Sequence, residues 1–329
     1  MTQHFSPIRI VQTRSVAESE HLVDAAVVGV HEVEKAFGDV DRSVIARSAL
    51  KPIQVMPLVT SGAADAFSFS DEDIALGAAS HSAEIMHLDR TAAILERIGL
   101  GESSLECGAA RPLSPEQADR VVASGEPFRR IHNCCSGKHA GFLAIAQHLG
   151  IDPAGYIEPD HEVQRLVTGA IAAFTGVDVS SQESGIDGCG IPTHSVPLRL
   201  LARSMARLVR ANEVDELDET ATRAADRVVA ALSANPRWMS GEGRAEVQFA
   251  ERSTEPLLCK IGAEGVFTAA LPERGLGIAV KARDGARRAG DVAMESILTN
   301  LGVLAEREAV HTVVNAEGTV VGTMYASWS

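Results

Sequence analysis

The sequence predicts an α/β fold in which a mainly antiparallel sheet, built from N- and C-terminal strands, carries a large inserted helical lobe. Short β-branched segments gather near both termini, and segments with apolar residues at three- and four-residue intervals fill the middle. Turn signals such as Pro272-Glu273-Arg274-Gly275 separate the late strands. Strands joined by such short turns are antiparallel. If the strands from both ends of the chain form one sheet, the two ends must lie close together.

The expected elements follow in order along the chain. Two strands come first, at 8–13 and 22–30. Helices are then expected at 51–61, 70–79, 83–98, 137–149, 162–174, 197–209 and 219–232. Ser70 and Asp218 are typical helix N-caps. The last elements are strands 257–261, 266–271 and 276–282, a helix at about 286–301, and strands 310–315 and 319–325.

This order predicts one catalytic unit over residues 1–329. Its sheet lobe is expected at about 1–47 and 250–329, and its helical lobe at about 48–249. The sequence shows no internal repeat and no linker long enough to separate independent domains. A small-molecule pocket is expected at the seam between the lobes, a common position for such sites.

Composition and charge exclude several classes of protein. With 45% hydrophobic and 22% charged residues, the chain has ample material for a core. A formal charge of −14 argues against binding to nucleic acid or to an anionic membrane surface. No apolar run approaches the roughly 18 residues that span a bilayer, and the first residues lack the apolar centre of a secretory signal. We therefore expect a cytoplasmic protein.

The five cysteines form an odd set, which argues against a disulfide framework in such a protein. They are then reduced thiols or metal ligands. For Cys107 and Cys259, simple packing in the core is the more common role.

Ser48 and Lys51 form the first candidate catalytic pair. The segment Arg47-Ser48-Ala49-Leu50-Lys51-Pro52 is expected to open the first helix, where a three-residue spacing places both side chains on one face. A lysine of lowered pKa can remove the proton of a serine nucleophile. The tetrad occurs often by chance, and an N-cap serine beside a solvated lysine is the alternative.

A second lysine, Lys260, strengthens this interpretation. Cys259-Lys260-Ile261-Gly262 lies on an expected strand and is similar to the Lys-x-Gly element of penicillin-binding proteins and serine β-lactamases, which also carry Ser-x-x-Lys. An ordinary edge-strand lysine is the alternative. Ser80-His81-Ser82 is the nearest match to their Ser-Asp-Asn element and differs in composition, so the chemistry need not be β-lactam hydrolysis.

A cysteine- and histidine-rich octapeptide, residues 132–139, runs into a helix, and the glycine-rich turn 187–194 holds another cysteine. Thiolates of Cys135 and Cys189 suit zinc, with Lys138 as a rare third ligand. Spacing alone leaves two alternatives: buried thiols beside an anion-binding helix start, or a Cys135–His139 nucleophile and base. In either case the region is expected to line the pocket.

These motifs together resemble the rhizobial-type L-asparaginases, the asparaginase II family, from about residue 8 to residue 325. The segments that carry the resemblance are 47–52, 79–82, 106–108, 132–139, 187–192 and 259–265. The resemblance implies a serine β-lactamase-like fold, a homodimer, and two serine–lysine pairs, Ser48 with Lys51 and Ser80 with Lys260. It also implies a zinc ion held by Cys135, Lys138 and Cys189.

The expected reaction is hydrolysis of L-asparagine to L-aspartate and ammonia. Ser48 would form an acyl-enzyme with Lys51 as base, while Ser80 and Lys260 relay protons. The remaining candidates, which would bind the substrate's carboxylate and ammonium, are Arg47, His139 and Asp187. Two alternatives stay open: a penicillin-recognising serine hydrolase and a zinc-thiolate sensor module. The sequence does not separate asparagine from glutamine.

Overall fold

The computed structural model describes residues 2–305 and 311–328. The chain divides into two compact units, each described by itself. We call Met1–Ala49, Ser195–Arg210 and Gln248–Ser329 the sheet unit, and Leu50–His194 with Ala211–Val247 the helical unit. Residues 195–210, expected in the helical lobe, thus group with the sheet.

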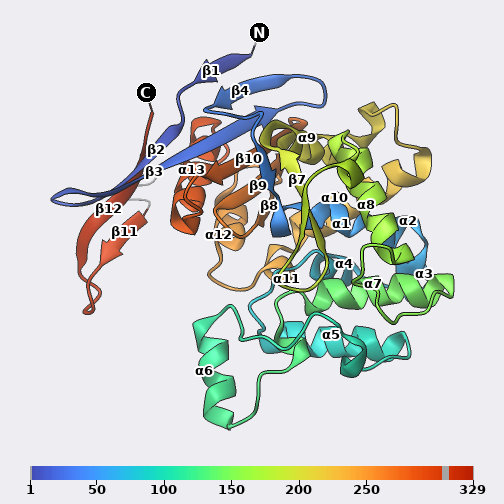
Figure 1. The fold of residues 1–329 in the computed structure, drawn as a ribbon. Helices are drawn as coiled ribbons and strands as arrows, with labels where there is room; N and C mark the ends of the chain where they lie inside the picture. The colour runs from blue at the N-terminus through green and yellow to red at the C-terminus, as the bar shows by residue number, and fades with distance from the viewer. Residues whose placement is uncertain (1, 306–310, 329) are drawn as a thin grey trace. The chain divides into compact units, whose positions relative to one another are not determined.

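One large sheet dominates the sheet unit (Figure 1). Among the described residues its main path runs β11-β12-β2-β3-β10-β9-β8, with β4 also paired to β3 and β1 paired to β4. Every pairing is antiparallel except that of β1 with β4. The strands are β1 Gln3–Phe5, β2 Ile8–Arg14, β3 Val16–Val28, β4 Val33–Phe37, β8 Leu258–Ile261, β9 Val266–Leu271, β10 Leu276–Ala282, β11 His311–Val314 and β12 Val320–Ser327.

Helices cover the centre of this sheet. Successive strand residues point to opposite faces, and both Ile278 and Ala279 of β10 are fully buried, so both faces of the strand are covered. Helices α9 (Leu198–Val209) and α13 (Arg287–Asn300) contact β10. At Gly277 a β-carbon would lie 1.9 Å from the carbonyl oxygen of Ala202, so only glycine lets α9 approach this closely.

The helical unit is built around α7 (Ser136–Leu149), which is buried from its first residue to Ala146 and contacts α2, α3, α4 and α5. At Gly137 a β-carbon would lie 2.6 Å from the carbonyl oxygen of Leu76, so glycine allows the close crossing of α4 and α7. The other helices are α1 Lys51–Gln54, α2 Met56–Thr60, α3 Ala63–Ala66, α4 Asp71–Gly77, α5 Ile85–Arg97, α6 Pro115–Ser124, α8 Glu162–Thr175, α10 Glu219–Ala234 and α11 Pro236–Met239.

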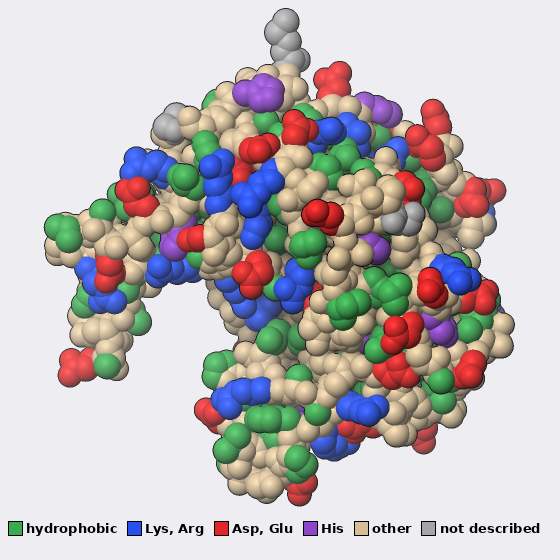
Figure 2. Space-filling model, viewed as in Figure 1, with side chains coloured by type: hydrophobic (Ala, Val, Ile, Leu, Met, Phe, Trp, Pro, Cys, Tyr) green, Lys and Arg blue, Asp and Glu red, His purple; other side chains and the backbone are tan. Residues whose placement is uncertain are grey.

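The chain also forms three short strands, β5, β6 and β7, and the helix α12. In the sheet unit, β5 (Ser43–Ile45) pairs with the second half of β7 (Pro192–Pro197), and in the helical unit β6 (Ser184–Ile186) pairs with its first half. The helix α12 covers Ala245–Arg252. No helix in the described ranges is long and apolar enough to cross a membrane. On the face shown in Figure 2, acidic, basic and hydrophobic side chains are interspersed.

The expected α/β class, with a mainly antiparallel sheet from both termini and an inserted helical region, is confirmed. The first helix differs from its expected form. The α-helix begins at Lys51, as expected for 51–61, but the opening segment Arg47–Leu50 forms a 3-10 turn, η1, because Pro52 has no amide proton to donate to the carbonyl of Ser48. Pro57 likewise has none for Ile53, and the helix breaks at Val55. Val310, expected in the strand 310–315, lies outside the described residues.

Candidate active site

Lys51 lies at the centre of a buried polar cluster in the helical unit. Its side chain is almost completely buried at the start of α1. The amine donates hydrogen bonds to the hydroxyl of Ser80 at 2.8 Å and to the carbonyl oxygen of Ala79 at 2.5 Å. It also lies 3.2 Å from the sulfur of Cys135. A lysine, a serine hydroxyl and a thiol are thus in direct contact, out of bulk water.

Three cysteines and a second lysine extend this cluster. Cys135 precedes the first residue of α7, and its sulfur lies 3.8 Å from that of Cys134. Lys138, one turn into α7, donates a hydrogen bond of 3.1 Å to the sulfur of Cys189. Cys189 lies in the tight turn that follows β6, closed by the Gly190 amide bonding to the carbonyl of Asp187.

The neighbours of Cys135 lower the pKa of its thiol. Hydrogen bonds from Cys134 and Cys189, together with the charges of the two lysines, hold its pKa well below the ordinary 9.0 in spite of burial. The same hydrogen bond to Cys135, together with burial, raises the pKa of Cys189. Burial alone would lower the pKa of Lys138, but the neighbouring thiols outweigh it and the pKa is raised. The surroundings of Cys135 therefore favour its thiolate form.

The segment from Ala79 to Glu84, between α4 and α5, presents Ser80 to Lys51. The amide of Ser80 donates to the carbonyl of Met239, and the amide of His81 donates to that of Cys134. Ala83 has a φ of 62°, a conformation that L-residues rarely adopt. Contacts to two neighbouring segments thus fix an otherwise irregular stretch of backbone.

Glu84 is the main side-chain anchor of this segment. Its carboxylate accepts hydrogen bonds from the hydroxyl of Ser82 and from the amide of Glu242, each at 2.7 Å. It also pairs with the guanidinium of Arg237 at 3.0 Å. Burial alone would raise the pKa of Glu84, but these hydrogen bonds hold it below 4.5. At Gly241 a β-carbon would lie 1.8 Å from the Ser82 hydroxyl, so the turn after α11 fits closely over the segment.

Two buried histidines flank the cluster, and burial holds the pKa of each well below 6.5. His81 contacts the hydroxyl of Ser136 at 2.9 Å. The Nδ1 of His139 lies 2.7 Å from the hydroxyl of Tyr156, while its Nε2 is buried without a hydrogen-bond partner among the described residues. A buried neutral imidazole with one unused nitrogen is suited to bind a polar ligand.

The remaining sequence-predicted residues are only partly placed by these contacts. Ser48 and Arg47 are half-buried in η1 of the sheet unit. Lys260 is fully buried on β8 and donates 3.1 Å to the carbonyl of Ile261. Asp187 is half-buried, and its carboxylate accepts from the amide of Gly188. The pairs Ser48 with Lys51 and Ser80 with Lys260 would join the two units, and they stay predictions.

A comparison with known protein families shows which family the chain belongs to. The model of the L-asparaginase II family matches residues 10–326, nearly the whole chain. The chain belongs to the L-asparaginase II family. Membership supports amidohydrolase activity, the coarser part of the function expected from the sequence. No curated protein sequence matches the chain.

Solved structures similar to this L-asparaginase II family member are distant. Mglu, in its tris and glutamate form, is 16% identical with a TM-score of 0.39; the match covers 88% of this chain, which spans 61% of Mglu. The Bacillus subtilis glutaminase YbgJ, in covalent complex with 5-oxo-L-norleucine, is 13% identical over 90% of this chain and 93% of its own, with a TM-score of 0.41. A Mycobacterium bovis beta-lactamase, Mb2281c, is 14% identical over 86% and 95%, with a TM-score of 0.42. At these scores the likenesses carry no argument about the reaction.

The three residues expected to bind zinc, Cys135, Lys138 and Cys189, are neighbours in the cluster. Cys189 contacts both Lys138 and Cys135. Two neighbouring thiols are suited to a soft divalent ion, whereas Lys138 could bind it only after losing its own proton. Within the described residues, no group of three or more His, Cys, Asp and Glu side chains could hold a metal. The two thiols suit a soft ion, the raised pKa of Lys138 opposes its use as a third ligand, and the zinc site stays a prediction.

Sequence reasoning missed several residues of this site. Tyr156 positions His139, and Glu84 with Arg237 holds the serine segment. No local pattern indicates them, since Glu84 and Arg237 are 153 positions apart. Only the tertiary fold brings them together.

Proposed function

We propose that this chain is an L-asparaginase, which hydrolyses the side-chain amide of L-asparagine to L-aspartate and ammonia. The observation that carries the proposal is the match of the L-asparaginase II family over residues 10–326. The buried contact between Lys51 and Ser80 adds the chemical means, because it places an amine beside a hydroxyl in a site without bulk water. A cytoplasmic location and a homodimer remain predictions.

The proposed reaction is nucleophilic. The hydroxyl oxygen of Ser48 attacks the carboxamide carbon while Lys51 takes the hydroxyl proton, and that proton leaves with the amide nitrogen as ammonia. Water then hydrolyses the ester, which releases aspartate and restores the serine. The contact between Lys51 and Ser80 supports a relay in which Ser80 passes protons to and from the amine. Lys260 would serve the same relay.

The same contact makes Ser80 the second candidate nucleophile. Its oxygen lies 2.8 Å from the amine of Lys51, within the range expected for a nucleophile and its base. We retain Ser48 as the nucleophile and Ser80 as the relay, and the two assignments differ in which serine becomes esterified.

Substrate binding is assigned to Arg47, His139 and Asp187. An α-carboxylate would pair with the guanidinium of Arg47, and an ammonium with the carboxylate of Asp187. The unused Nε2 of His139 would supply one neutral hydrogen bond. Charge pairs at both ends of a small amino acid would provide most of its discrimination.

Zinc is proposed as the cofactor, held by Cys135, Lys138 and Cys189. When bound, it would supply a fixed positive charge that orients the polar groups around it, rather than an activated water. The thiolate character of Cys135 supports this assignment. The zinc-thiolate sensor is the alternative in which these residues bind metal without catalysis.

The test is ammonia release by the purified protein from asparagine and from glutamine, beside hydrolysis of a chromogenic β-lactam. We expect asparagine to be the best substrate. Preference for the β-lactam would instead favour a penicillin-recognising hydrolase, and no turnover of any of the three would favour the sensor. Peptide mapping by mass spectrometry of enzyme quenched during turnover would locate the ester on Ser48 or Ser80.

A further inference from the structure

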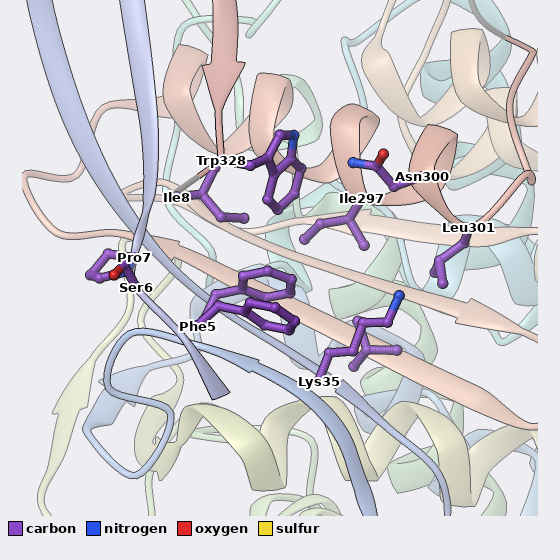
Figure 3. A pocket seen from close by; sticks show the side chains of 11 residues that line it. Phe5, Ser6, Pro7, Ile8, Lys35, Ile297, Asn300, Leu301 and Trp328 are labelled. Carbon is purple, nitrogen blue, oxygen red and sulfur yellow. The ribbon is translucent and has the colours of Figure 1, made fainter. Parts of the chain in front are cut away.

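A pocket of about 460 Å³ opens within the sheet unit (Figure 3). The end of β1, the start of β2, β4, the end of α13 and Trp328, which follows β12, line it. Its volume lies in the range of small-molecule sites. The residues assigned to catalysis, substrate and zinc do not line it.

Three aromatic rings form one wall of this pocket. Phe5 stacks on Phe37 with ring centroids 4.9 Å apart, and Trp328 meets Phe37 edge-on at 5.2 Å. Phe37 is buried, but Phe5 and Trp328 remain 42% and 40% exposed. Two large exposed rings on one preformed wall leave apolar surface in water, and an apolar ligand would cover it favourably.

The opposite wall is aliphatic, and the pocket has a single charge. Ile297 of α13 and Leu301, which directly follows that helix, supply the apolar surface, with the amide of Asn300 beside them (Figure 3). Among the described lining residues, Lys35 is the one charged side chain, and its amine extends into the space between Phe5 and Leu301. The described residues offer Lys35 no carboxylate partner. One cation above an apolar cavity favours a ligand with one negative charge.

We propose that this pocket binds a small amphipathic carboxylate. Its aromatic or aliphatic body lies between the ring wall and α13, and its carboxylate pairs with the amine of Lys35. Asn300 can donate a second hydrogen bond from its amide. The inference is independent of the proposed asparaginase reaction, because it uses none of the same residues.

The first test uses the two tryptophans of the chain as reporters. Decanoate is titrated into the full-length protein while tryptophan emission is followed. We expect a saturable change that disappears in Trp328→Phe and persists in Trp238→Phe, whose indole lies in the helical unit. A change that follows Trp238 instead, or no saturable binding up to about 1 mM by calorimetry, would overturn the proposal.

The second test separates the charge from the apolar body. Lys35→Glu is expected to weaken decanoate binding by roughly fivefold or more, while decanol, which has no charge, loses less than about twofold. Arg9→Glu makes the same change in net charge on β2, outside the pocket, and is expected to leave the affinity within about twofold. Equal effects of both variants, or tighter binding of butyrate than of decanoate, would contradict the proposed site. The proposal would also be contradicted if the wild-type protein formed oligomers, decanoate did not bind to it, and decanoate did not separate those oligomers.

Discussion

The amine of Lys51 donates a 2.8 Å hydrogen bond to the hydroxyl of Ser80, and both side chains are buried in the same compact unit. The resemblance in sequence predicts two other pairs, Lys51 with Ser48 and Ser80 with Lys260. The contact therefore joins one member of each expected pair. It gives a direct route for a proton between the proposed base and the proposed relay.

Removal of the Ser80 hydroxyl tests this route. Ser80→Ala is expected to lower kcat on asparagine by about 10²- to 10³-fold with little change in KM, because a relay acts on the chemical step. Steady-state ammonia release measures both parameters. Ser204→Ala, another buried serine whose hydroxyl only caps a helical carbonyl, is the control and should retain activity. A Ser80→Ala enzyme with more than half of the wild-type kcat would eliminate Ser80 from the chemistry.

A substitution of Glu84 tests whether its carboxylate must hold the segment from Ala79 to Glu84 in place. Glu84→Gln weakens the ion pair with Arg237 and the bond from the Glu242 amide, so we expect a loss of about 1–3 kcal/mol in the free energy of unfolding and a lower kcat. Urea denaturation and steady-state kinetics measure the two effects. Glu116→Gln, which disturbs an exposed helical pair with Arg120, should change stability by less than about 0.5 kcal/mol. Equal stabilities of the two variants would refute the anchoring role.

The same carboxylate predicts a pH dependence of stability. The pKa of Glu84 is lower in the folded protein than the ordinary value of 4.5, which applies to the unfolded chain. At a pH between these two pKa values, the unfolded chain therefore binds more protons than the folded protein. Its contribution is fully present above about pH 4.5 and is lost as the pH falls through the folded pKa. The difference in unfolding free energy between the wild type and Glu84→Gln should therefore shrink on acidification. A difference that grows below pH 4.5 would contradict this assignment.

A substitution of Gly241 tests how closely the turn after α11 packs on the segment from Ala79 to Glu84. Its φ of 116° is unfavourable for any L-residue, and an added β-carbon would collide with the Ser82 hydroxyl. We expect Gly241→Ala to cost about 3 kcal/mol or more. Gly243, with a φ of 72° and no atom within 4 Å of an added β-carbon, is the matched control, and its alanine variant should cost only about 1–2 kcal/mol. Thermal unfolding of both variants checks the order.

The proposed metal site gives a prediction that does not depend on activity. Cys135→Ser and Cys189→Ser should each lower the zinc content of purified protein, because a hydroxyl is a poor replacement for a thiolate. Cys259→Ser, in β8 of the sheet unit, is the control and should keep the wild-type content. Metal analysis that finds the same zinc content in all three would remove Cys135 and Cys189 as ligands.

Local sequence signals explain which parts of the fold were predictable. Ser70 and Asp218 cap α4 and α10 as expected, because the cap and the amide it accepts from are three residues apart. The strands β8 to β10 follow from β-branched runs and short turns. The helix expected over 51–61 is interrupted at Val55, because Pro57 has no amide proton to donate to the carbonyl of Ile53. Helix α6 was missed because Ala118 is its one buried residue, so apolar periodicity is weak there.

The candidate site was predictable only where its residues are close in sequence. Cys135, Lys138 and His139 share one octapeptide and lie together at the start of α7, where Cys135 is the N-cap residue. Ser80 and Lys51 were both singled out, but their mutual contact depends on how α1 and the segment after α4 pack. Tyr156, Glu84 and Arg237 carry no motif at all, and tertiary packing alone gives them their roles.

The most direct test of the account is ammonia release from asparagine by Ser48→Ala, with Ser43→Ala, an exposed serine of β5, as the control. The proposed acyl-enzyme predicts that kcat/KM falls by at least about 10³-fold in Ser48→Ala while its melting temperature and zinc content stay at wild-type values. The control should retain full activity. If Ser48→Ala keeps most of its asparagine turnover, Ser48 is not the nucleophile.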